Sequence, residues 1–329
     1  MNDVISNNEL SDWQVAGLRY YGYGFFLKKK FGDRVQKVSI DGGFTCPNVD
    51  GTVAIGGCTF CDNRSFSPSR RIPKTAIRDQ IDVGIENLKR RYRCEKFIAY
   101  FQPATNTYGA IDRLRPLYFE ALSDPRIVGM AIGTRTDCVP DEVLDLLEEV
   151  AGHTYLSVEY GMQTVHNRSL EWMNRGHDHE ATVDAIERSR NRGFEVCLHI
   201  MLGLPGESYE DMMATAEEVA RLKVDAVKIH NLYAVKKTPL GEQVERGEID
   251  LLQRDEYIHT LVDFLERIPT TNVVERISGE APPEYLVGPD WCLDKSAIRL
   301  ALDAELLKRD SFQGKRWQPE CVADSCSKS

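Results

Sequence analysis

Short apolar runs rich in Val, Ile and Phe alternate along the chain with longer segments in which apolar residues recur at helical spacing, beginning near residue 35. Six such strand-then-helix units can be counted. The predicted strands are Val35–Ile40, Lys96–Phe101, Ile127–Ile132, Thr154–Tyr160, Glu195–Leu202 and Asp225–Leu232. The predicted helices between them include Ile77–Arg93, Pro140–Ala151, Glu180–Arg192 and Tyr209–Leu222. This alternation predicts an α/β protein with a parallel sheet.

Polar residues gather where the predicted strands end. Strands that are almost continuously apolar fit either a doubly wound sheet or an incomplete TIM-like barrel, and periodicity alone does not separate the two. Both architectures place function on the loops after the strands. The polar strand ends are Gln102–Asn106, Thr134–Asp137, Glu159–Gln163 and His230–Asn231. They predict one shared polar face.

The chain divides into three predicted parts. Residues 1–34 form an extension rich in aromatic and basic side chains, and residues 35–270 form the core of strand-helix units. Residues 271–329 form a second extension with a predicted strand at Val273–Ile277 and a predicted helix at Asp294–Lys308. The last residues lose all periodicity, which is typical of a frayed tail.

The net charge, and the absence of a predicted membrane helix or signal peptide, exclude several classes of protein. The chain has 329 residues, with 41 Lys and Arg against 51 Asp and Glu, so its net charge is −10. An acidic protein of this kind does not coat nucleic acid through its whole surface. No apolar stretch approaches the ~18 residues of a membrane helix, and no signal-peptide layout is present, so we expect a cytoplasmic protein without a membrane partner.

Three of the nine cysteines, Cys46, Cys58 and Cys61, lie in one Gly-rich loop directly after the first predicted strand. In a reducing compartment such thiols are metal ligands or catalytic groups more often than disulfides. A closed zinc site needs four protein ligands, and no histidine lies in this loop. Three thiolates suit a [4Fe–4S] cluster that keeps one iron open for a ligand. A zinc knuckle completed from elsewhere and three thiols that merely pack remain alternatives to this cluster.

Seven segments in order along the chain resemble the radical S-adenosylmethionine (SAM) superfamily. They are Gly43–Asn48, Gly57–Cys61, Phe101–Gln102 with Thr105–Tyr108, Gly133–Arg135, Glu159–Gln163, Asn174–His177 and His199–Glu207. Within the superfamily the chain is similar to the YhcC/YtqA-type proteins, which are related to the Elongator catalytic subunit and to oxygen-independent coproporphyrinogen dehydrogenase.

The resemblance implies a partial (β/α)6 TIM-like barrel with N-terminal and C-terminal extensions. It also implies that the open iron binds SAM, and that one electron cleaves SAM to a 5′-deoxyadenosyl radical that abstracts hydrogen from a substrate in the barrel mouth. An electron donor such as flavodoxin or ferredoxin is implied as well.

The implied site has two groups of residues. The cluster ligands would be Cys46, Cys58 and Cys61. The SAM-binding residues would be Phe60, Gln102, Thr105, Asn106, Glu159, Gln163, Arg175, His199, Met201 and Gly203. Among them, Arg175 is the expected partner of the SAM carboxylate because a guanidinium offers a planar two-point fork.

The substrate is the open question. Kinship with Elongator suggests tRNA, and basic residues alternate with aromatic ones between Arg19 and Lys37. The same stripe could instead cover one end of the barrel. The alternatives are a radical SAM enzyme acting on a small metabolite or a protein side chain, and a non-catalytic iron–sulfur or zinc sensor. His230 could serve the substrate or simply the core, and an auxiliary cluster on Cys292, Cys321 and Cys326 has little support from their spacing.

Overall fold

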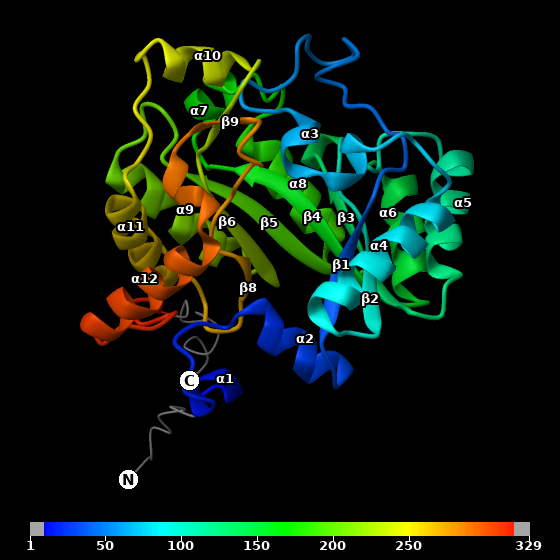
Figure 1. Cartoon of the computed structure of the whole chain (residues 1–329), viewed down its shortest axis with the longest axis horizontal. Coiled ribbons are helices and arrows are strands. Elements are labelled where there is room, and N and C mark those ends of the chain that lie inside the picture. The colour runs from blue at the N-terminus through cyan, green and yellow to red at the C-terminus, as the bar shows by residue number, and fades with distance from the viewer. Residues whose placement is uncertain (1–9, 319–329) are drawn as a thin grey trace, which may run out of the picture.

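The computed structural model describes residues 10–318, which form a parallel seven-stranded sheet covered by helices (Figure 1). The strand order is β1-β2-β3-β4-β5-β6-β8. These strands are β1 (Val35–Ile40), β2 (Lys96–Phe101), β3 (Ile127–Thr134), β4 (Tyr155–Gln163), β5 (Glu195–Leu202), β6 (Ala226–Asn231) and β8 (Val273–Arg276). A separate antiparallel pair joins β7 (Ala234–Val235) to β9 (Leu286–Gly288).

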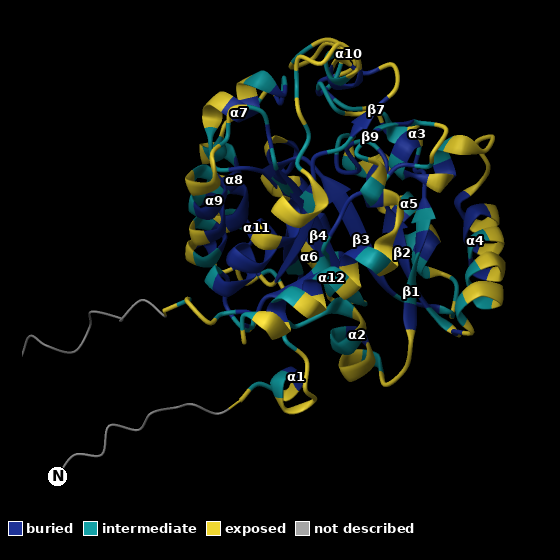
Figure 2. Cartoon of the chain, turned by 60° about the vertical axis from the view of Figure 1, so that its left-hand side comes forward, coloured by how far each residue is buried: buried dark blue, intermediate teal, exposed yellow. Residues whose placement is uncertain are grey.

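The helices follow the strands as the periodicity predicts. They are α1 (Asp12–Val15), α2 (Tyr23–Phe31), α3 (Asn63–Phe66), α4 (Ile77–Tyr92), α5 (Ile111–Leu122), α6 (Asp141–Ala151), α7 (Asn167–Trp172), α8 (His179–Ser189), α9 (Tyr209–Leu222), α10 (Pro239–Glu245), α11 (Arg254–Arg267) and α12 (Lys295–Lys308). The described residues also form three short 3-10 turns, η1 (Pro68–Arg71), η2 (Thr136–Cys138) and η3 (Asp290–Leu293). Figure 2 shows dark, buried strands inside helices whose outer faces are exposed.

The sheet is curled into a half-barrel. Strands β1 and β8 are its two edges, yet Lys37 Nζ of β1 lies 2.6 Å from Glu275 Oε2 of β8. Side chains of opposite edges can meet only if the sheet bends around a central lumen. Apolar residues on the convex side of the strands pack against the surrounding helices in one continuous core. The architecture is therefore the partial TIM-like barrel that the resemblance implied.

All six predicted strands are present, with differences at their ends. Strand β3 continues to Thr134 and β4 to Gln163, because these residues still pair with their neighbours in the sheet. The strand predicted at Val273–Ile277 is β8, which pairs in parallel with β6. It adds a seventh strand to the six that the alternating units predict.

The N-terminal aromatic segment covers the lower end of the lumen, beside the amino ends of the strands. Phe26 stacks with Tyr23 and contacts Tyr155 of β4, with ring centroids 6.0 and 6.1 Å away. Gly22 forms a bridge to Val274 of β8. The same segment packs on Cys197, Ala226 and Val273 inside the barrel. We call residues 20–31 the floor segment.

The basic residues of this region also have partners within the fold. Lys29 pairs with Asp12, and Lys30 lies 2.8 Å from Glu195. Lys37 is held inside the lumen. The structure thus favours barrel covering over base stacking for the aromatic and basic stripe. No helix within residues 10–318 is long and apolar enough to cross a membrane.

Candidate active site

The loop that carries Cys46, Cys58 and Cys61 lies over the carboxyl ends of the strands. Its backbone is fixed from two sides. Thr59 N donates to Met173 O at 3.0 Å, and Thr59 O accepts from Leu240 N at 3.0 Å. Asn48 Nδ2 donates to the carbonyls of Asn174 at 2.6 Å and Arg175 at 2.9 Å. The cysteine loop is therefore docked on the segment that follows α7.

The three cysteines differ in exposure: Cys58 is buried, Cys46 is half-buried and the Cys61 residue is exposed. Desolvation within the loop, followed by the neighbouring Cys58 and Cys46, raises the pKa of the Cys61 thiol to about 12. A free thiolate is thus disfavoured at Cys61 without a cationic partner. A metal centre supplies such a partner, because a coordinated thiol is deprotonated outright.

Within residues 10–318, no three His, Cys, Asp or Glu side chains converge closely enough to hold one metal ion. In a [4Fe–4S] cube each thiolate binds a different iron, so its ligands need not converge on one point. The donor set fits such a cluster: three thiols, on one loop, at the strand ends.

Arg175 links the cysteine loop to the sheet. This buried side chain places Nη1 3.6 Å from Cys58 Sγ and donates from Nη2 to the carbonyl of Gly161 at 3.0 Å. A Cβ at Gly161 would lie 2.5 Å from Arg175 Nη2 and 2.7 Å from Gln163 Nε2. The missing side chain at Gly161 therefore makes room for both predicted cofactor residues.

Several buried polar atoms around this point have no partner in residues 10–318. They are Asn48 Oδ1, Asn106 Oδ1, Arg135 Nη1, Arg175 Nε and His177 Nε2. Arg135 is fixed by a two-point ion pair with Asp137, at 2.8 and 2.7 Å. A buried polar atom without a hydrogen bond lowers the stability of the folded protein. A cluster of such atoms therefore indicates a site where a polar ligand would form the missing hydrogen bonds.

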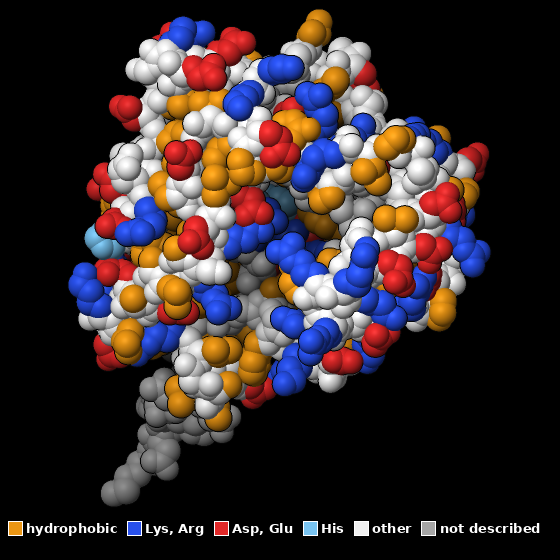
Figure 3. Space-filling model, in the orientation of Figure 1, with side chains coloured by type: hydrophobic (Ala, Val, Ile, Leu, Met, Phe, Trp, Pro, Cys, Tyr) orange, Lys and Arg blue, Asp and Glu red, His pale blue; other side chains and the backbone are white. Residues whose placement is uncertain are grey.

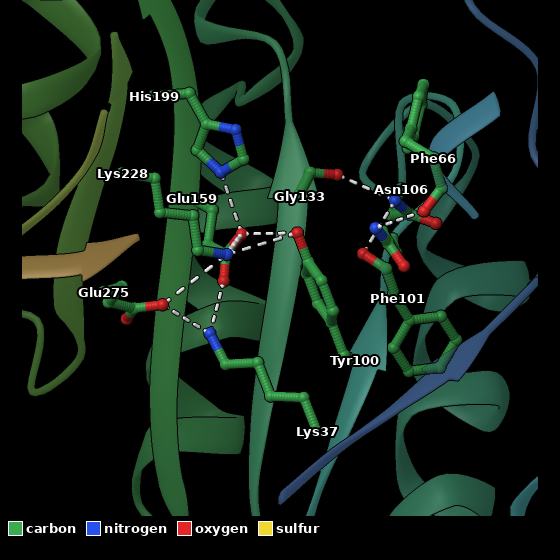
Figure 4. A network of polar contacts seen from close by, with 11 residues as sticks. Lys37, Phe66, Tyr100, Phe101, Asn106, Gly133, Glu159, His199, Lys228 and Glu275 are labelled. Atoms are coloured by element: carbon green, nitrogen blue, oxygen red, sulfur yellow. Dashed lines mark hydrogen bonds and ion pairs between the residues drawn. The ribbon is translucent and has the colours of Figure 1, made fainter. Parts of the chain in front are cut away.

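The polar residues that follow β2 are held by hydrogen bonds to neighbouring backbone carbonyls. Asn106 Nδ2 donates to the carbonyls of Phe101 at 3.0 Å and Gly133 at 2.8 Å, and Gln102 Nε2 donates to Phe66 O at 3.1 Å (Figure 4). Thr105 N donates to Thr45 O beside Cys46. These residues tie the end of β2 to β3 and to the cysteine loop.

Phe60 and Met201 lie in one apolar cluster with Leu170, Met173 and Leu204. Gly203 follows at φ 86°, and a Cβ there would lie 2.7 Å from Leu252 Cδ1. Gln163 also has a left-handed φ of 68°, which ends β4. The structure thus brings the predicted Phe60 and Met201 together and turns the chain sharply at Gln163 and Gly203.

Glu159 and His199 lie deeper, inside the lumen. Glu159 is fully buried and receives Tyr100 Oη at 2.6 Å, Lys37 Nζ at 2.8 Å and His199 Nε2 at 2.9 Å, with Lys228 as a fourth partner (Figure 4). Glu275 accepts from Lys37 and lies 3.5 Å from Lys228. The contact of Glu159 with SAM stays a prediction, since its observed partners are all side chains of the barrel.

Electrostatics keep this lumen network ionised around one carboxylate. Burial opposes ionisation of Glu159, but Lys228, Lys37 and His199 outweigh it and hold its pKa well below the usual range. Burial lowers the pKa of His199, and burial followed by the nearby Arg276 lowers the pKa of His230 well below its usual value. The two imidazoles stack with centroids 5.3 Å apart. Burial thus favours the neutral form of both histidines.

Sequence reasoning missed some residues beside the cysteine loop. Cys138 is buried and lies near Cys46, and burial raises the pKa of its thiol to about 12. Burial and Arg175 lower the pKa of His177 to about 4. The loop after β3 signalled this in its polar run Thr134–Asp137. Cys292 packs in a separate apolar cluster, and Cys321 and Cys326 lie outside the described residues.

Two family models and a near full-length relative match this chain. The Radical SAM superfamily model matches residues 55–219, and the Radical_SAM C-terminal domain model matches residues 224–308. The uncharacterized protein YtqA of Bacillus subtilis is 41% identical over 307 residues, covering 91% of this chain and 93% of YtqA. The first match begins after Cys46 and includes Cys58 and Cys61.

Two further relatives are more distant. The tRNA uridine(34) acetyltransferase of Methanocaldococcus jannaschii is 31% identical over 169 residues, or 50% of this chain and 30% of that protein. The solved structure of an archaeal Elp3 from Methanocaldococcus infernus superposes with a TM-score of 0.63 at 20% identity, over 85% of this chain and 64% of that one. The latter likeness concerns the fold alone. Together the family models and the near full-length relative show that the chain belongs to the radical SAM superfamily of enzymes.

Proposed function

We propose that this protein binds a [4Fe–4S] cluster through Cys46, Cys58 and Cys61 and cleaves SAM to start a radical reaction. The observation that carries the proposal is the position of the cysteine loop, which is docked over the strand ends of a radical SAM barrel and linked to β4 through Arg175. When bound, the cluster and SAM would together supply a 5′-deoxyadenosyl radical that removes hydrogen from a substrate.

The protein's own part is to bind and orient. Arg175 sits between Cys58 and Gly161, where its charge suits the carboxylate of SAM. The unpaired Asn48 Oδ1 and Asn106 Oδ1 offer acceptors for an amino group or a ribose hydroxyl. Phe60 and Met201 form an apolar surface suited to an adenine ring. Each of these roles is part of the proposal.

The deciding experiment is an anaerobic assay of SAM cleavage. The reconstituted protein is mixed with SAM and dithionite, and 5′-deoxyadenosine is measured by mass spectrometry alongside iron, sulfide and zinc. We expect 5′-deoxyadenosine and about four iron atoms per chain. Bound zinc with no 5′-deoxyadenosine would instead support a sensor and contradict the proposal. Flavodoxin and ferredoxin would then be compared with dithionite as electron donors.

For the substrate, kinship with a tRNA uridine(34) acetyltransferase over half of the chain supports tRNA. A small metabolite or a protein side chain is supported by the charged lumen below the cysteine loop. Nucleoside mass spectrometry of tRNA from a deletion strain separates these classes, because an unchanged nucleoside profile contradicts the tRNA proposal.

A further inference from the structure

A β-bulge in β8 turns two consecutive side chains toward the lumen. Val227 pairs with Val274, but the next residue, Lys228, pairs with Arg276, so Glu275 is the extra residue. Glu275 contacts Lys37 and Lys228 inside the lumen. Arg276 is the register partner of Lys228 and therefore shares its lumen face. Without the bulge, Arg276 would point to the opposite side of the sheet.

Arg276 has no hydrogen bond or ion pair with any other residue of the range 10–318, although it is half-buried. It contributes to the pKa shifts of His199, His230, Tyr100 and Tyr233, in each of which burial is the largest cause. The guanidinium is thus near these lumen groups and, among residues 10–318, forms no ion pair with Glu159 or Glu275.

A second polar group at this level is also unpartnered. Nε2 of His230 is buried and has no hydrogen-bond partner in the described chain. The backbone at Gly279 packs on the other side of this ring, where a Cβ would lie 3.1 Å from His230 Nδ1. Gly279 N donates to Asn231 Oδ1 at 2.9 Å, which fixes that backbone. Nε2 rather than Nδ1 is therefore the ring nitrogen of His230 that is left for a ligand.

The charges of the lumen do not cancel. At their ordinary charges, the three basic side chains Lys37, Lys228 and Arg276 outnumber the two acidic ones, Glu159 and Glu275, by one. Burial lowers the pKa of Lys228, but the carboxylate of Glu159 opposes this shift. Burial also favours the neutral form of the two histidines. One positive charge is left over, and it resides on the residue without a partner. Buried charges are normally paired, so a half-buried cation without an acidic partner in residues 10–318 favours a negatively charged ligand.

We propose that Arg276 and His230 bind a carboxylate group of the substrate inside the lumen. This inference deepens the proposed function, on which it rests, by naming a chemical group of the molecule that receives the radical. A carboxylate matches the single excess charge, and its two oxygens match the planar fork of Arg276. A dianionic phosphate would bring a second negative charge next to Glu159 and Glu275.

The position suits a substrate below the cluster. Tyr233 is close enough to both Arg276 and Cys61 for each to affect its pKa, which burial, the largest cause, raises to about 12. Tyr233 is therefore near both Arg276 and the cysteine loop. Figure 3 shows the concave face of the molecule hollowed at its centre, with a histidine at depth and charged side chains of both signs around it. A small acid could enter by this hollow.

The test uses acetate and inorganic phosphate as probes on the full-length protein. Each anion is added at constant ionic strength with chloride as the reference, and the ring signals of the seven histidines are followed by ¹H–¹⁵N NMR. We expect acetate to shift the signals of His230 and His199 with saturation in the millimolar range, and to leave the exposed His259 unchanged. R276Q should weaken the acetate response at least tenfold, whereas R276K should retain part of it.

A matched surface variant, R115Q, should respond to acetate like the wild type, because Arg115 is an exposed helix residue paired with Glu149. The proposal is overturned if acetate leaves His230 unchanged, if R276Q and R115Q respond alike, or if phosphate binds more tightly than acetate. Acetate binding is measured without SAM turnover, so the assay tests this inference separately from the proposed function. Loss of SAM cleavage with intact acetate binding would contradict the proposed function, and the reverse result would contradict only this inference.

Discussion

Lys37 and Glu275 stand on the two edge strands of the sheet, yet their charged atoms lie 2.6 Å apart. The contact spans the side on which the barrel has no backbone hydrogen bonds between β1 and β8. Both side chains also join the network around Glu159. Side-chain charges thus connect the two edges that the backbone leaves apart.

Replacing Glu159 by Gln should destabilise the protein by about 3–5 kcal/mol, because Lys37 and Lys228 would lose their shared buried counter-charge. Urea unfolding of E159Q and the wild type measures this difference. E195Q is the control, since Glu195 makes a more exposed ion pair with Lys30. A difference below 1 kcal/mol would contradict the view that Glu159 compensates these charges.

The stability of the wild type should also depend on pH through Glu159. The pKa of this carboxyl is lower in the folded protein than its ordinary value of 4.5. The stabilisation is therefore fully present above about pH 4.5 and is lost as the pH falls through the lower folded value. Unfolding free energies between pH 3 and 6 should fall less steeply for E159Q than for the wild type. Parallel curves would contradict this assignment.

Replacement of Cys46, Cys58 or Cys61 by Ala should abolish both the visible cluster absorbance and SAM cleavage. Cys94 is the control, because it is buried in the helix-covered core. C94A should retain both signals at near wild-type levels. SAM cleavage that persists in any of the three loop variants would refute the ligand assignment.

Replacement of Arg175 by Ala should weaken SAM binding by at least tenfold, since hydrogen bonds to charged groups contribute about 1.5–3 kcal/mol. Equilibrium binding of SAM to the reconstituted protein measures the effect. The cluster absorbance should remain, because Arg175 only contacts the sulfur of Cys58 from outside. R175K should bind SAM with intermediate affinity, and a wild-type affinity in R175A would exclude the proposed carboxylate contact.

An Ala at Gly161 should act like a milder form of the Arg175 variant. Its Cβ would come within 2.5 Å of Arg175 Nη2, so the flexible guanidinium must move. SAM affinity should fall several-fold with little change in stability. Gly24 is a matched control, because an added Cβ there meets nothing within 4 Å. Equal SAM affinities for G161A and G24A would contradict the positioning role of Gly161.

Replacement of Phe26 by Ala tests the role of the floor segment. The ring packs against Tyr23 and Tyr155, so its loss should lower the free energy of unfolding by about 3 kcal/mol. Phe31 provides a comparison, since it contacts Tyr155 from the end of α2. A stable F26A variant with a changed tRNA nucleoside profile would revive the nucleic-acid interpretation of this segment.

The sequence predicted the sheet and the cysteine loop because both signals are local. Val35–Ile40 carries its apolar pattern in six consecutive residues, and the observed strand has the same bounds. The spacing of Cys46, Cys58 and Cys61 is likewise visible without any tertiary information. The radical SAM family was recognisable at this level, and the partial barrel followed from that resemblance because periodicity alone also fits a doubly wound sheet.

The lumen could not be predicted in the same way. Strand periodicity places Lys228 and His230 on one face, but nothing in the sequence says that Lys37, more than 180 positions away, meets the same carboxylate. Arg276 is harder still, because period-two alternation assigns it to the face opposite Glu275. Only the bulge in the β6 pairing brings both residues inside.

The floor segment and the residues just before it bind residues 270–311 of the chain. Trp13 Nε1 donates to Thr270 O, Val274 N donates to Tyr21 O, and Arg19 Nη1 donates to Ser311 O. Trp13 and Thr270 are 257 positions apart in the sequence. During synthesis, the N-terminal members of these pairs therefore have no partner until the later segment has been made. The half-barrel therefore remains open from below until residues 270–311 have been synthesised, so a cluster inserted into the nascent protein before then would meet solvent on that side.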